Sequence, residues 1–156
     1  MEQKRKRRII FCSIVLFFNL LFIWGNSLMP GRISAAISGF VGRLLSGLMS
    51  GEIPEDVPAG EGILRKIAHL LEFCSLGFFC SALLRLLKKK YPYALVAGFL
   101  TGCIDECIQL LVPARGPRFR DVLIDTLGVI AGIGVFTILL LLKHRKKQIL
   151  LEDTKS

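Results

Sequence analysis

The chain has 156 residues, of which 53% are hydrophobic, and it carries a formal net charge of +9. Its mean hydropathy is +0.58. This composition is too apolar for an ordinary soluble domain and favours an integral membrane protein. The positive charge does not indicate a nucleic-acid-binding protein, because the basic residues cluster beside apolar runs, as they do at the cytoplasmic ends of membrane spans.

Four apolar runs are long enough to cross a hydrocarbon core about 30 Å thick. They cover about residues 9–28, 63–87, 94–112 and 122–142. Because the runs fill more than half of the chain, residues 1–156 are predicted to form one all-α membrane domain. The predicted fold is a four-transmembrane-helix bundle with no separate soluble catalytic domain.

Basic clusters precede the first run and follow the second and fourth runs. They lie at residues 4–8, 85–90 and 143–147. The positive-inside rule therefore places both termini in the cytoplasm. It places the 29–62 connection and the 113–121 loop on the outer side.

The segment 30–50 carries apolar residues at three- and four-residue steps, among them Ile33, Ile37, Phe40 and Leu44. This spacing predicts an amphipathic helix. The segment is too polar to span the bilayer, so we expect it to lie in the outer interface or to dip into the membrane as a re-entrant cover.

Three of the apolar runs contain polar residues near the ends that are predicted to face outward. They are Arg65, His69 and Glu72 in the second run, Asp105, Glu106 and Gln109 in the third, and Asp121 and Asp125 in the fourth. Since ionisable groups are costly inside a membrane span, they mark a candidate functional site. The alternating direction of the runs predicts one polar cluster that opens outward.

The loop between the third and fourth runs is short and basic, although it faces outward. Its arginines are Arg115, Arg118 and Arg120. This local departure from the positive-inside rule suggests that the arginines have partners, either the nearby carboxylates or an anionic ligand. In the fourth run, Gly128 and Gly132 share a face with the aspartates, which is typical of close helix packing and would also suit a contact between two copies of the chain.

These residues occur in an order that resembles a known family. The matching motifs are Arg65-Lys66-x-x-His69-x-x-Glu72, Asp105-Glu106-x-x-Gln109, Val112-Pro113-Ala114-Arg115 and Asp121-Val122-x-x-Asp125. Together they are similar to the VanZ-like membrane family. The resemblance implies a bacterial plasma-membrane protein linked to resistance against teicoplanin-type glycopeptides, which bind cell-wall precursors outside the membrane. It implies a location and a phenotype rather than a reaction.

The first functional hypothesis is a binding protein of the cell envelope. Its outward-facing pocket would hold a lipid-linked cell-wall precursor or another anionic lipid headgroup, with arginines on the anion. The candidate ligand-binding residues are Arg65, Gln109, Arg115, Arg118, Arg120, Asp121 and Asp125.

Two alternatives stay open at this stage. In the first, the chain is an intramembrane hydrolase or transferase whose polar groups act as acid and base or hold a divalent metal, which would be its one cofactor. The candidate catalytic residues are His69, Glu72, Asp105 and Glu106. In the second, the cluster is structural or binds a partner, and the arginines and His69 merely neutralise the acids.

Overall fold

The structure, a computed structural model, describes residues 2–50, 61–90, 92–113 and 118–153. These residues form five α-helices and no strand, so the predicted all-α class is confirmed. The helices are α1 (Glu2–Leu28), α2 (Gly31–Ser50), α3 (Glu61–Leu86), α4 (Pro92–Gln109) and α5 (Phe119–Asp153).

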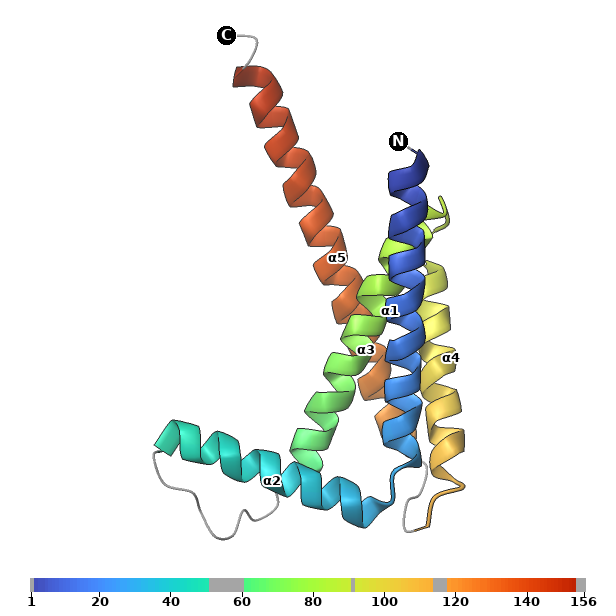
Figure 1. Cartoon of the computed structure of the whole chain (residues 1–156), viewed down its shortest axis with the longest axis vertical. Coiled ribbons are helices and arrows are strands. Elements are labelled where there is room, and N and C mark those ends of the chain that lie inside the picture. The colour runs from blue at the N-terminus through green and yellow to red at the C-terminus, as the bar shows by residue number, and fades with distance from the viewer. Residues whose placement is uncertain (1, 51–60, 91, 114–117, 154–156) are drawn as a thin grey trace.

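Four of the helices run alongside one another, and α2 lies across one end of the group (Figure 1). The start of α1 and the end of α5 are both at the opposite end, where α5 leans away from the bundle (Figure 1). Many large apolar side chains are exposed along the outer faces, among them Phe11, Phe18 and Phe22 of α1. Such a surface suits contact with lipid.

Three helices, α1, α3 and α5, are long and apolar enough to cross a membrane by length and composition. Helix α4 has 18 residues but carries Asp105, Glu106 and Gln109 among them, which lowers its hydropathy. The three apolar helices favour a membrane protein.

Two helices have ends that differ from the ends of the apolar runs. Helix α4 ends at Gln109 rather than near residue 112, because Leu111 and Val112 turn back with shorter-range bonds to the carbonyls of Ile108 and Gln109. Helix α5 continues from residue 142 to Asp153. Lysine, arginine and glutamine favour helices, so the end of the apolar run does not end the helix.

The closest packing in the fold joins α3 to α5. A β-carbon added at Gly132 would collide with the carbonyl oxygen of Cys74, and one at Gly128 would lie 2.7 Å from the carbonyl oxygen of Leu70. Only glycine allows the two backbones to approach this far. The predicted packing face of α5 is therefore used within the chain, against α3.

The apolar core lies where α1, α3 and α5 meet. Its buried members are Ile23, Phe73, Leu76 and Val129. Phe73 follows Glu72 directly and lies one helical turn after His69, so the core adjoins the polar cluster. Close packing here fixes the positions of the helices that carry the polar side chains.

Helix α3 ends in a Schellman motif at the basic end of the molecule. The N–H of Lys89 donates to the carbonyl of Leu84, and the N–H of Lys88 donates to that of Arg85. Lys88 takes the left-handed conformation that this motif needs, with φ of 58°.

Candidate polar ligand site

Asp105 is the most deeply buried acid of the site, with no exposed surface. It lies on α4 and faces α1. Its Oδ1 accepts a hydrogen bond of 2.5 Å from the hydroxyl of Ser27, and its Oδ2 accepts one of 2.9 Å from the amide of Gln109. Two neutral donors thus hold the carboxylate, and the one from Ser27 joins α1 to α4.

Glu72 is held in a similar way between α3 and α1. Its Oε1 accepts a hydrogen bond of 2.7 Å from the side-chain amide of Asn26. Its Oε2 is buried without a hydrogen-bond partner among the described residues. This bond joins α3 to α1 at Glu72.

Glu106 fixes the entry into α5. Its Oε2 accepts a hydrogen bond of 2.6 Å from the backbone N–H of Arg118, one residue before α5 begins. A carboxylate at this place is favourable, because it meets the unpaired N–H groups and the positive end of the helix dipole.

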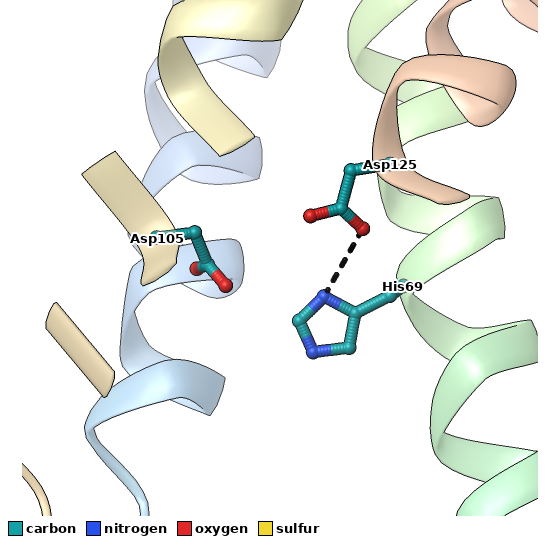
Figure 2. A group of neighbouring side chains, drawn as sticks. All are labelled: His69, Asp105 and Asp125. Atoms are coloured by element: carbon teal, nitrogen blue, oxygen red, sulfur yellow. Dashed lines mark ion pairs between the residues drawn. The ribbon is translucent and has the colours of Figure 1, made fainter. Parts of the chain in front are cut away.

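His69 and Asp125 bring α3 and α5 together at the centre of the site. The Nδ1 of His69 lies 3.7 Å from Oδ1 of Asp125. Figure 2 shows the carboxylates of Asp105 and Asp125 pointing toward each other across the space beside the imidazole. One ligand atom from each of the three residues lies within 4.8 Å of the others.

Asp125 has unused bonding capacity. Its side chain is almost fully buried, and its Oδ2 has no hydrogen-bond partner in the described part of the chain. A buried carboxylate oxygen without a donor is costly, so the geometry suits an additional proton, water or cation at this point.

Two adjoining hollows open beside His69. One lies between α3, α4 and α5, encloses about 10 Å³, which is room for about one water molecule, and has both charged and amide groups in its wall. Its lining residues are Arg65, Lys66, His69, Gln109, Asp121, Ile124 and Asp125. The second lies between α1, α2 and α3, with Arg65, His69 and Glu72 in its wall. Arg65 and His69 therefore stand between the two hollows.

The arginines of the site form no ion pairs with the acids among the described residues. Arg65 is half-buried, whereas Arg118 and Arg120 are exposed, and none of the three forms an ion pair with a described carboxylate. Arg115 lies outside the described residues. Three guanidinium groups therefore stand near the pocket without a carboxylate partner among those residues.

Comparison with known proteins assigns the chain to a family. The VanZ/LLP1 family model matches residues 8–141, which cover all five helices in whole or in part. The chain belongs to the VanZ/LLP1 family. The predicted resemblance is thereby confirmed. No curated protein and no solved structure matches the VanZ/LLP1 chain.

The structure brings together a different set of residues from the candidate catalytic set that the sequence predicted. The predicted metal or acid–base set combined His69 with Glu72, Asp105 and Glu106, whereas the structure gathers His69 with Asp105 and Asp125. Glu72 and Glu106 have separate partners on α1 and before α5.

Sequence reasoning missed the donors of α1 and one residue of the pocket wall. Asn26 and Ser27 hold two of the acids, and Lys66 lines the hollow beside Arg65. A usable signal was present in α1, since Asn26 lies seven residues after Asn19 and therefore on the same face of an otherwise apolar helix.

Proposed function

We propose that this VanZ/LLP1 chain is a multi-pass protein of the bacterial plasma membrane with four spans, formed by α1, α3, α4 and α5. At 1.5 Å per residue, the 18 residues of α4 reach about 27 Å, close to the thickness of the hydrocarbon core. Helix α2 then rests in the outer interface, and the basic end with both termini faces the cytoplasm. The placement of α2 across the opposite end supports this arrangement (Figure 1).

In this orientation the polar site opens to the outer leaflet and binds the anionic group of a lipid-linked cell-envelope ligand. The observation that carries the proposal is the set of cationic groups at and beside the pocket that form no ion pair with a described carboxylate. Arg65 and Lys66 line the hollow itself, and Arg118 and Arg120 are exposed at the start of α5. Guanidinium groups suit phosphate oxygens because they can donate two parallel hydrogen bonds.

The buried acids supply the rest of the recognition. Asp105 is already held by Ser27 and Gln109, so it is fixed before a ligand arrives. A preorganised site loses less conformational entropy on binding. Asp121 and Asp125 line the wall of the same hollow and can accept hydrogen bonds from amine or sugar hydroxyl groups of the ligand.

The biological outcome we propose is a contribution to tolerance of teicoplanin-type glycopeptides, through binding of a lipid-linked cell-wall precursor. The test compares the wild type with Arg65→Gln and with Arg43→Gln, an exposed arginine of α2, in a sensitive bacterium at matched membrane levels. Wild type and Arg43→Gln should raise the inhibitory concentration of teicoplanin, and Arg65→Gln should not. Equal protection by both variants, or none by the wild type, contradicts the proposal.

A second candidate function is an intramembrane hydrolase or transferase that uses a divalent metal. The cluster of His69, Asp105 and Asp125 favours it, since one imidazole and two carboxylates suit Zn²⁺ or Mn²⁺. Ligand atoms about 2 Å from a tetrahedral ion lie roughly 3.3 Å apart, so the farthest pair of these atoms must close by at most roughly 1.5 Å. The metal would supply Lewis-acid chemistry on a phosphate ester or amide.

The metal content of the purified full chain tests this candidate. If the chain is a metal-dependent enzyme, the wild type should hold about one ion per chain and Asp125→Asn should hold none. The control is Glu152→Gln, which changes an exposed acid near the end of α5 and should also hold about one ion. Asp125→Asn should also lose hydrolysis of a fluorogenic phosphodiester. A metal-free wild type, or an Asp125→Asn variant with unchanged metal content, removes the candidate.

A further inference from the structure

A third hollow lies at the opposite end of the bundle, far along the helices from the polar site. It is a groove of about 640 Å³ between the first turns of α1, the end of α3 and the second half of α5. We call it the basic groove. It is lined by Arg8, Phe11, Cys12, Ala82, Arg85, Leu86, Phe136, Leu140, Lys143, His144, Lys146, Lys147 and Leu150.

Among the described residues, the basic groove has five lysines and arginines in its wall and no acid. None of these five cations forms an ion pair with a described carboxylate. Nη2 of Arg85 on α3 donates a hydrogen bond of 3.4 Å to Nε2 of His144 on α5. Cationic groups that converge from separate helices repel one another unless an anion lies between them.

Part of the wall of the basic groove is apolar. Phe11, Phe136 and Leu140 face it from α1 and α5. Its shape is fixed near the mouth, because the guanidinium of Arg5 donates to the carbonyl of Leu86 with distances of 2.7 and 3.0 Å and so joins α1 to the end of α3. The groove thus offers cations at the rim beside a surface for hydrocarbon.

We propose that the basic groove binds one anionic phospholipid from the leaflet at this end, with its phosphate between Arg85 and Lys143 and an acyl chain along Phe136 and Leu140. Basic pockets between membrane helices suit such headgroups, and their attraction falls with each charge removed. A free phosphate would leave the apolar wall in water, which is why the hydrocarbon chain belongs to the recognised ligand. This site does not depend on the function of the outward pocket.

The test measures lipid binding by native mass spectrometry of the purified full chain in detergent. The probes are phosphatidylglycerol and phosphatidylcholine with identical acyl chains. The double variant Arg85→Gln with Lys143→Gln removes two groove charges. Its matched control is Lys89→Gln with Lys90→Gln, which removes two exposed charges at the same end but outside the groove wall.

Phosphatidylglycerol should bind the wild type and the control pair in preference to phosphatidylcholine. The groove pair should bind it roughly thirtyfold more weakly, from about fivefold per basic residue. Excess inorganic phosphate should not displace the lipid. If Arg85→Gln with Lys143→Gln fails to fold, Lys146→Gln with Lys147→Gln on exposed turns of α5 gives the same comparison. Equal losses in groove and control pairs, equal binding of both lipids, or displacement by phosphate overturns the proposal.

Discussion

Two glycines of α5, two residues apart, offer a sharp test of the α3–α5 packing. A β-carbon at Gly132 would collide with the carbonyl oxygen of Cys74 and would lie 2.7 Å from the backbone nitrogen of Phe78. A β-carbon at Gly134 would meet nothing within 4 Å. The obstacle at Gly132 is backbone rather than a flexible side chain, so α5 itself would have to move.

The two alanine substitutions should change the free energy of unfolding in opposite directions. Overpacking of this kind costs about 3 kcal/mol at its upper range, while replacing a helical glycine by alanine gains about 1 kcal/mol. Gly132→Ala should therefore lower the free energy of unfolding by about 2 kcal/mol, and Gly134→Ala should raise it by about 1 kcal/mol. At roughly 2–4 °C per kcal/mol for a chain of this size, the two variants should differ by about 6–12 °C in Tm.

The assay heats each detergent-solubilised variant in steps and follows the remaining monodisperse protein by gel filtration. Comparing the two alanine variants with each other cancels the effect of the detergent, since their composition is identical. If Gly132→Ala is as stable as Gly134→Ala, the close approach of α3 and α5 is wrong.

Three further predictions concern the site and the end of α3. Ser27→Ala removes a hydrogen-bond donor from the buried carboxylate of Asp105. The free energy of unfolding should therefore fall by about 1.5–3 kcal/mol in the same heating assay. An unchanged Tm would show that this hydrogen bond does not stabilise the fold. Lys88→Gly relieves the left-handed conformation of a residue with a β-carbon, so stability should rise by about 1 kcal/mol, and a fall would contradict the cap. Glu106→Gln keeps an acceptor for the backbone N–H of Arg118, so the fold should persist while teicoplanin tolerance falls; full tolerance would show that this charge is dispensable.

Much of the fold was predictable because helices have strong local signals. Apolar length marked α1, α3 and α5, and the four-residue spacing of Asp105 and Gln109 predicted that they share a face of α4, where both are buried. The amphipathic period likewise predicted α2 at nearly its observed bounds. Such patterns depend only on residues within one helix.

The partners within the site were not predictable for a physical reason. Periodicity fixes which face of a helix is polar, but not which helix that face meets. Glu72 and His69 share a face of α3, yet Glu72 meets Asn26 of α1 while His69 meets Asp125 of α5. That division depends on the close glycine packing of α3 against α5, which joins segments more than 50 residues apart in the sequence.

The central claim is that Arg65 and its pocket hold the anionic group of a lipid-linked ligand. The most direct measurement is the binding of a polyprenyl phosphate and of the uncharged polyprenol to the purified full chain. A background with Arg85→Gln and Lys143→Gln keeps the basic groove from contributing. The wild-type protein and the Arg43→Gln variant should bind the polyprenyl phosphate and not the polyprenol. The Arg65→Gln variant should bind the phosphate roughly 10- to 100-fold more weakly, which corresponds to the loss of one charge-assisted hydrogen bond. Equal binding of phosphate and alcohol, or an Arg65→Gln variant that binds as tightly as Arg43→Gln, would contradict the account.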